Sequence, residues 1–381
     1  MNIRFFVLAI GVILVACSTA GQATQTQAPE PTSTPESATT PTELVETELP
    51  PSPVPTNTQQ LVPTEIPFDM SQPIQLDFTW YENNPVLNKG SSGEWDSRRL
   101  MEGKVVLVDE LFHMFYTAVS SDSFGIGYAA SPDGFTFTKN DTNPIFQPIG
   151  EGFDANGVSQ GTPLFVGDKW MLFYNAIAPG EEFNRITAGG SSIGLTTAPE
   201  PIGPWTSGQQ VLKTGGSGEW DSGFIFPNSI ILNEDGYRMY YSAGPDPDSN
   251  EMSCGMATSQ DGLTWTKYND PATTEAPFAE SDPVMQPGPS AWETLLVQCR
   301  VLKTAKGWEM FYMGSNGRSS GRPGYAFSTD GVRWIKYEDN PILNKPLISP
   351  YAIKVGTTYY LYGHDFDSGE LIAATGTITQ P

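Results

Sequence analysis

Apolar and polar residues alternate along residues 73–381 in a unit that recurs five times. Each unit contains two apolar runs joined by a short polar turn, as in VVLVDELFHMFY (105–116) and PLFVGDKWMLFY (163–174). Paired alternating runs around a tight turn predict β-hairpins. The second run of each unit ends in a tyrosine, namely Tyr116, Tyr174, Tyr241, Tyr312 and Tyr362. We therefore expect an all-β chain built from structural repeats.

A short run with small residues follows each hairpin, as in IGYAAS (126–131) and CGMATS (254–259). In three units this run leads into a Ser-x-Asp-Gly turn, with Asp133, Asp261 and Asp330 as its aspartates. An aspartate at this place can bond its own turn, and the glycine supplies a positive φ. These turns resemble the Asp-boxes of sialidase-like propellers, and we expect their aspartates to be structural.

A fourth strand with an Asn-Pro exit completes the unit, as in WIKYEDNPILNK (334–345). The fifth unit ends at Pro381 without such a strand, whereas the similar segment FTWYENNPVLNK (78–89) precedes the first unit. Pairing of this N-terminal segment with the last unit would leave no free sheet edge. The sequence thus predicts a five-bladed β-propeller over residues 73–381, closed by an N-terminal strand.

Residues 1–17, MNIRFFVLAIGVILVAC, combine a basic start with an apolar run too short to span a bilayer. They end in Leu-Val-Ala-Cys, which resembles the lipobox of bacterial lipoproteins. The resemblance implies a signal peptide cleaved before Cys17 and lipidation of that cysteine, which would anchor the protein outside the cytoplasm at a membrane of the cell envelope. An ordinary secretory signal with a chance cysteine is the alternative.

Residues 18–72 are rich in Thr, Pro, Glu and Ser and contain neither Lys nor Arg. Such a segment has little to bury, so we expect a disordered linker. The 381-residue chain has a net charge of −23, which argues against a nucleic-acid partner. A neutral carbohydrate is compatible with this charge, and we expect a monomer.

The chain contains three cysteines and two histidines. Cys254 and Cys299 either form a disulfide in an oxidising compartment or remain two small buried residues. No cysteine spacing typical of zinc sites occurs. We expect no metal and no cofactor, and the sequence does not support a structural calcium ion.

The five repeats, the closing N-terminal strand and the stretch APEPIGPW (198–205) together resemble the glycosidase propellers. These include the arabinanase and β-xylosidase type (glycoside hydrolase family 43) and the invertase and levansucrase types. The resemblance implies a surface glycosidase that acts on extracellular oligo- or polysaccharides. Its functional carboxylates would lie on the innermost strands, because glycoside cleavage needs one acid and one base or nucleophile.

Acidic residues recur at the start of four expected blades, and Glu102 lies where it breaks the repeat. The candidate catalytic residues are therefore Asp96, Glu102, Asp154, Asp221 and Glu293. The acid that the arabinanase pattern places near a proline in blade three is absent, because Phe226 stands before Pro227. Three alternatives remain: the blade-start acids catalyse with Glu102, the protein binds sugar without cleaving it, or the recurring acids only stabilise the repeat.

The candidate substrate-binding residues lie at the blade starts and inner strands: Trp95, Arg98, Arg99, Gln160, Trp220, Asn228, Gln298, Arg300 and His364. Arginines can bind a ligand or pair with the nearby acids. Tryptophans can stack on sugar rings or pack between blades. Loops 175–192, 242–253 and 313–322 are expected to line the same face. A protein-interaction propeller, which would have an apolar top face, is a further alternative.

Overall fold

The computed structural model describes residues 68–69, 72–119, 124–181, 190–246, 251–316 and 321–380. The predicted signal peptide, Cys17, nearly all of the predicted linker and parts of the predicted top-face loops lie outside these residues. Every described residue belongs to the compact unit Pro55–Pro381. The described ranges contain strands and turns but no helix. They therefore include no helix that is long and apolar enough to cross a bilayer.

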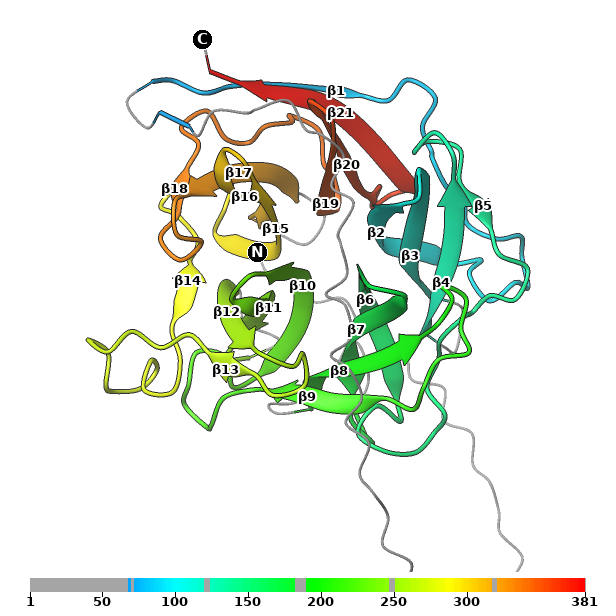
Figure 1. The fold of residues 1–381 in the computed structure, drawn as a ribbon, viewed down its shortest axis with the longest axis horizontal. Coiled ribbons are helices and arrows are strands. Elements are labelled where there is room, and N and C mark those ends of the chain that lie inside the picture. Colours follow the sequence, from blue (N-terminus) through cyan, green and yellow to red (C-terminus); the bar gives the residue numbers. More distant parts are fainter. Residues whose placement is uncertain are drawn as a thin grey trace, which may run out of the picture. The chain divides into compact units, whose positions relative to one another are not determined.

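Five antiparallel sheets surround one axis, and the first strand of the repeat is the innermost strand of each sheet (Figure 1). Blade 1 contains β2 (Arg99–Val108), β3 (Leu111–Val119), β4 (Phe124–Ser131) and β5 (Thr138–Lys139). Blade 2 contains β6 (Gly157–Val166), β7 (Lys169–Ile177), β8 (Ser191–Ala198) and β9 (Gln209–Lys213). Blade 3 contains β10 (Phe224–Asn233), β11 (Gly236–Gly244), β12 (Ser253–Ser259), β13 (Thr266–Lys267) and a fifth strand, β14 (Pro283–Met285). Blade 4 contains β15 (Leu295–Thr304), β16 (Gly307–Ser315), β17 (Arg322–Ser328) and β18 (Ile335–Lys336).

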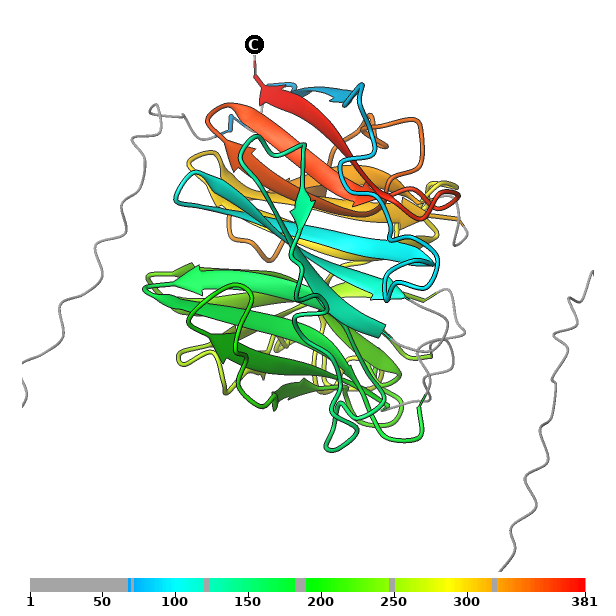
Figure 2. The ribbon, with the colours of Figure 1, turned by 90° about the vertical axis from the view of Figure 1, so that its right-hand side faces the viewer.

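Blade 5 combines the two ends of the propeller. It contains β19 (Ile348–Val355), β20 (Thr358–His364), β21 (Leu371–Thr379) and the N-terminal β1 (Gln75–Trp80). Strand β1 runs antiparallel to β21 (Figure 2), from Gln75 opposite Thr379 to Trp80 opposite Ala374. Beyond this strand, the Asn84 side chain bonds both backbone groups of Ala373. The predicted five-bladed propeller and its closure by an N-terminal strand are thus confirmed.

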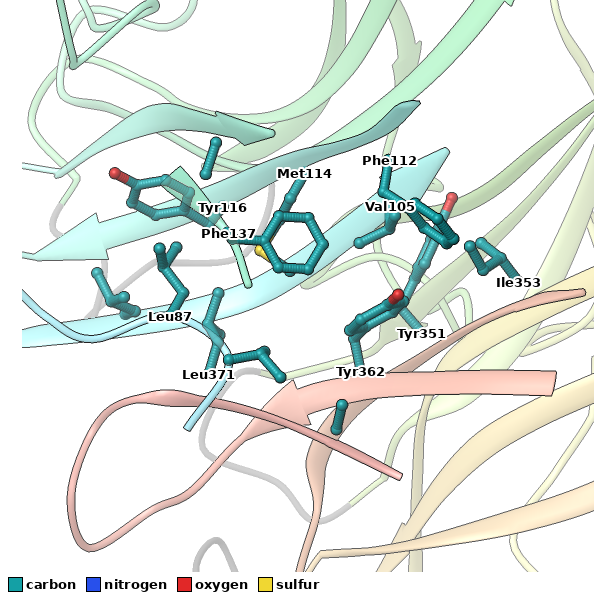
Figure 3. Close-up of a cluster of buried hydrophobic side chains, with 14 of the residues drawn as sticks. Leu87, Val105, Phe112, Met114, Tyr116, Phe137, Tyr351, Ile353, Tyr362 and Leu371 are labelled. Atoms are coloured by element: carbon teal, nitrogen blue, oxygen red, sulfur yellow. The ribbon is translucent and has the colours of Figure 1, made fainter. Parts of the chain in front are cut away.

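The recurrent tyrosine of the second strand explains why the third strand carries small residues. A Cβ atom at Gly127 would collide with the ring of Tyr116, and Gly194 leaves the same space for Tyr174. Neighbouring blades then pack through apolar faces. Between blades 1 and 5, for example, Met114 and Phe137 lie close to Tyr362 and Leu371 (Figure 3).

The Ser-x-Asp-Gly turns close on their own aspartates. In blade 3, Asp261 Oδ1 accepts hydrogen bonds from the backbone N–H groups of Thr264 at 2.7 Å and Leu263 at 2.8 Å. It also accepts one from the Ser259 hydroxyl at 3.0 Å. These bonds favour the ionised carboxylate, led by the Thr264 and Leu263 amides, and lower the pKa of Asp261 to about 2.

Replacing Asp261 by asparagine is expected to destabilise the protein more near neutral pH than in strong acid. A carboxylate whose pKa is lower in the folded state than its ordinary value of 3.8 stabilises the fold above that value, and this stability is lost as pH falls toward about 2. Urea unfolding of both proteins at about pH 6 and about pH 2.5 measures the difference. Asp168→Asn, in the exposed turn between β6 and β7, controls for the loss of one negative charge. If the difference in free energy of unfolding between wild type and Asp261→Asn is the same at both pH values, this account is contradicted.

Candidate functional site

Each inner strand is interrupted by a register shift in the first half of its length. Four residues at these shifts have a positive φ, namely Glu102 (48°), Gln160 (57°), Gln298 (58°) and Ser349 (55°). In blade 3 the shift falls at Asn228, between Pro227 and Ser229. A bulge re-aims the side chain of its extra residue. Positive φ at a non-glycine residue costs about 1–3 kcal/mol and is concentrated at functional sites.

Four of these residues join in one hydrogen-bonded chain, which we call the axial chain: Asn228, Gln298, Gln160 and Glu102. Asn228 Nδ2 donates to Gln298 Oε1 at 3.2 Å, and Gln298 Nε2 donates to Gln160 Oε1 at 2.9 Å. Gln160 Nε2 then donates to Glu102 Oε1 at 3.1 Å. The chain links blades 1, 2, 3 and 4, and all four side chains are buried. The structure therefore brings four of the predicted site residues together.

Glu102 is the acceptor at the end of the axial chain. Its second oxygen, Oε2, is buried and has no hydrogen-bond partner among the described residues. Burial raises the pKa of Glu102, while the Thr117 hydroxyl and the Lys104 ammonium act in the opposite direction. A raised pKa favours the protonated form of the carboxyl group, which can donate a hydrogen bond to a ligand oxygen.

A second layer of polar residues lies two positions further along the inner strands. Lys104 Nζ donates to the backbone oxygens of Gln160 at 3.0 Å and Pro227 at 2.8 Å, and to Thr162 Oγ1 at 2.8 Å. Burial lowers the pKa of Lys104 to about 7, although Glu102 acts to raise it. Lys104 thus ties blades 1, 2 and 3 together. Lys104 was not among the predicted site residues, although a lysine inside the apolar run of β2 was a visible signal.

Arg300, predicted to bind substrate, belongs to this second layer. Its Nε donates to Ala352 O at 2.9 Å and its Nη1 donates to Ser229 Oγ at 3.0 Å. The guanidinium lies 4.2 Å from the centroid of the Tyr351 ring. These contacts join blades 3, 4 and 5, so the structure gives Arg300 a role in holding the ring of blades together.

The recurring acids at the blade starts bond within their own blades rather than with Glu102. In blade 1, Asp96 Oδ2 lies 2.6 Å from Lys139 Nζ and accepts from the Tyr116 hydroxyl at 3.4 Å. In blade 2, Asp154 accepts from the Tyr174 hydroxyl at 2.7 Å.

Blades 3 and 4 repeat the arrangement. Asp221 Oδ2 lies 2.6 Å from Lys267 Nζ, and Glu293 Oε1 lies 2.9 Å from Lys336 Nζ. Tyr312 donates to the other oxygen of Glu293 at 2.8 Å. The structure therefore favours the alternative in which these four acids stabilise the repeat. Within the described ranges, no three His, Cys, Asp or Glu side chains group as metal ligands.

The two candidate tryptophans stack on the recurrent tyrosines. Trp95 lies 5.9 Å from Tyr116 between ring centroids, and Trp220 lies 6.1 Å from Tyr241. Trp220 also donates from Nε1 to Ser281 Oγ at 3.0 Å. Packing within the blade accounts for these contacts.

The remaining candidates lie near blade 5. Arg98 is exposed, whereas Arg99 donates to Phe366 O at 2.9 Å and lies 4.6 Å from the centroid of its ring. His364 is buried, and its Nδ1 has no hydrogen-bond partner in the part of the chain that the structure describes. Burial and, next, the Arg99 charge lower the pKa of His364 to about 3, so the imidazole is neutral at physiological pH.

Apolar side chains from blades 3, 4 and 5 form one cluster, which we call the apolar wall: Phe226, Met252, Leu295, Val297, Met313, Ile348 and Phe366. Two of these residues, Val297 and Ile348, immediately precede a bulge, and Phe226 lies two positions before the bulge at Asn228. Next to the bulge in blade 2 lie Ser159 and Asn175, which are polar and bonded to each other at 3.3 Å. The site thus combines an apolar wall with amide groups, as small-molecule sites commonly do.

No protein-family model matches the chain, and no curated protein matches it. Several solved structures match the chain. A glycosyl hydrolase from Bacteroides ovatus is 16% identical with a TM-score of 0.56, over 79% of this chain and 93% of that one. A structure from the GH130 family of mannoside phosphorylases, described as containing glycoside hydrolases that target β-1,2-mannosidic linkages in Candida mannan, is 17% identical with a TM-score of 0.56, over 81% and 95%. The family 117 glycoside hydrolase Zg3597 from Zobellia galactanivorans is 16% identical with a TM-score of 0.53, over 80% and 90%. At these identities the likeness concerns the fold, which is that of glycosidase-type five-bladed propellers.

Proposed function

We propose that the protein binds a carbohydrate at the axial chain and does so without cleaving it. The observation that carries this proposal is the composition of the axial chain, which contains one carboxylate, Glu102, and three amides. Hydrolysis of a glycoside needs two carboxyl groups, about 5–10 Å apart, on either side of the bond. The fold shared with carbohydrate-active enzymes supports a saccharide as the ligand.

The axial chain is suited to binding sugar hydroxyls, because hydrogen bonds within it orient the side chains without using all of their donors and lone pairs. A glutamine amide has two N–H donors and an oxygen with two lone pairs. Within the axial chain, Gln160 and Gln298 each donate one hydrogen bond and accept one. The other donor and lone pair of each glutamine can bond hydroxyl groups. The apolar wall, with Phe226 and Phe366, offers a surface for the C–H face of the sugar.

Glycoside hydrolysis is the second candidate, and one observation favours it. The raised pKa of Glu102 is the property expected of a general acid. This candidate requires a second carboxylate near the ligand, which the axial chain does not contain.

Full-length protein is expected to bind a neutral oligosaccharide from a panel of gluco-, manno-, xylo- and arabino-oligosaccharides, without forming new reducing ends. Isothermal titration calorimetry measures binding, and mass spectrometry of the ligand detects cleavage. Gln298→Met removes the central amide and is expected to weaken binding about tenfold, which corresponds to about 1.4 kcal/mol. Gln209→Met, on the exposed β9, is the matched control.

Three results would change the proposal. Failure to bind any member of the panel would overturn carbohydrate binding. Cleavage that Glu102→Gln abolishes would establish the hydrolase instead. Equal binding by wild type and a folded Gln298→Met variant would remove the axial chain as the site.

We also propose that the chain is lipid-anchored outside the cytoplasm, through Cys17. The leader sequence carries this proposal, and the Cys254–Cys299 disulfide supports the location outside the cytoplasm, because disulfides persist in oxidising compartments. Cys17→Ser is expected to release the protein from the membrane fraction of a bacterial host, and mass spectrometry should find lipid on the wild-type N-terminus. Membrane retention of an unlipidated wild-type chain would contradict the anchor.

A further inference from the structure

A cavity of about 440 Å³ lies beside blade 3, and we call it the blade 3 cavity. Its walls include Trp220, Pro245, Met252, Phe278, Pro283 and Thr294. The volume lies within the range of about 300–1,000 Å³ that is common for small-molecule sites. None of the interactions described for the axial chain involves these residues.

One wall of the cavity comes from a segment that departs from the repeat. After β13, residues 268–282 lead to an extra strand, β14 (Pro283–Met285), which pairs with β12. Blade 3 therefore has five strands where four were predicted. Insertions into a structural repeat commonly carry the binding function of a repeat protein.

The inserted segment is held firmly against the start of blade 3. Trp220 N donates to Pro277 O at 2.9 Å, and Trp220 Nε1 donates to Ser281 Oγ at 3.0 Å. Glu280 N donates to Glu219 Oε2 at 3.1 Å. These bonds fix the positions of the aromatic and proline side chains, so the cavity exists before any ligand arrives.

The cavity adjoins the apolar wall of the proposed carbohydrate site. Met252 lines the cavity and also packs into the apolar wall. Thr294, on the cavity side, directly precedes Leu295 of the same wall. A chain-like ligand bound at the axial chain can therefore extend along the apolar wall into the cavity.

The chemistry of the lining selects the kind of unit that fits. The ring of Phe278 and four prolines offer apolar faces to sugar C–H groups, and Gln286 and Thr294 offer hydrogen bonds. Two carboxylates, Glu219 and Glu251, also line the cavity. They would repel a carboxylate on the ligand, so uronic acids are disfavoured, whereas neutral sugars and amino sugars are compatible.

We propose that the blade 3 cavity is a second subsite, which takes a further unit of a neutral or amino oligosaccharide whose first unit lies at the axial chain. This inference rests on the proposed carbohydrate-binding function. It predicts that affinity rises with chain length, because only the longer ligands reach the cavity.

Calorimetry on the full-length protein with cello-, manno- and xylo-oligosaccharides of one to four units tests this subsite. Thr294→Trp, at an exposed position, is designed to fill the cavity, and Phe278→Ala is designed to remove part of its wall. Both are expected to weaken the tetrasaccharide about tenfold and to leave the monosaccharide unchanged. Thr138→Trp, on the exposed face of β5, is the matched control. A galacturonic acid tetramer is expected to bind more weakly than the neutral ligands.

The outcomes separate the subsite from the function on which it rests. If no saccharide binds, the proposed function fails and the subsite with it. If saccharides bind but affinity does not depend on length, or if both variants weaken the monosaccharide as much as the tetrasaccharide, the subsite is refuted while carbohydrate binding stands. Equal binding of the galacturonic acid tetramer would overturn the assignment to neutral and amino sugars.

Discussion

Lys267→Met is expected to lower the free energy of unfolding by about 3–5 kcal/mol, because it leaves a buried carboxylate without its cation. The side chain of Asp221 is 0% exposed, and its Oδ2 lies 2.6 Å from Lys267 Nζ. The same oxygen also accepts a hydrogen bond from the Ser281 hydroxyl, but at 3.4 Å. Asp221 Oδ1 has no hydrogen-bond partner within the described ranges. Little else is therefore available to compensate the charge.

Denaturant unfolding of the two proteins measures this effect. Lys213→Met is the matched control, because Lys213 is exposed on β9 in blade 2 and should change stability by less than about 0.5 kcal/mol. The double variant Asp221→Leu/Lys267→Met removes both charges and is expected to recover much of the loss. A loss below about 1 kcal/mol for Lys267→Met alone would show that the pair behaves as a surface ion pair.

Replacing both Cys254 and Cys299 by alanine is expected to cost about 2–4 kcal/mol of stability. The disulfide joins β12 of blade 3 to β15 of blade 4 across 45 residues of sequence. Its removal lets the unfolded chain explore more conformations, and this lowers the free energy of unfolding. Alanine is the replacement of choice because both sites are 0% exposed and a serine hydroxyl would be buried there.

Chemical denaturation with and without a reductant provides the measurement. Reductant is expected to destabilise the wild type toward the level of the double variant and to leave the double variant unchanged. If the wild type and the double variant unfold at the same denaturant concentration without reductant, the cross-link does not stabilise the propeller.

The repeat could be predicted from the sequence because each of its parts is a local feature. The alternation before Tyr116 and the turn around Asp261 depend on residues that are near one another in the chain. The closing strand was also predictable, because the fifth unit lacked a segment that the N-terminus repeats. Candidate residues at the axis could be selected by the same register, and Glu102, Gln160, Asn228 and Gln298 do meet there.

The partners of the acids could not be predicted in this way. Asp96 and Glu102 are six positions apart, yet one bonds Lys139 within its blade and the other ends a chain that crosses the axis. The bulge in β2 produces this difference, and alternation alone does not reveal it. The extra strand of blade 3 and its cavity likewise depend on contacts between Trp220 and residues about sixty positions away.

The sequence by itself determined the all-β class, the five repeats, their closure and the turns, because hydrophobic period and turn chemistry act over a few residues. Only the tertiary structure decided which polar residues serve the fold and which face the axis. Four strands from four blades converge on the axial chain, and their distances are set by blade packing rather than by spacing along the chain. The role of Glu102 as the single carboxylate of that chain is therefore a property of the assembled propeller.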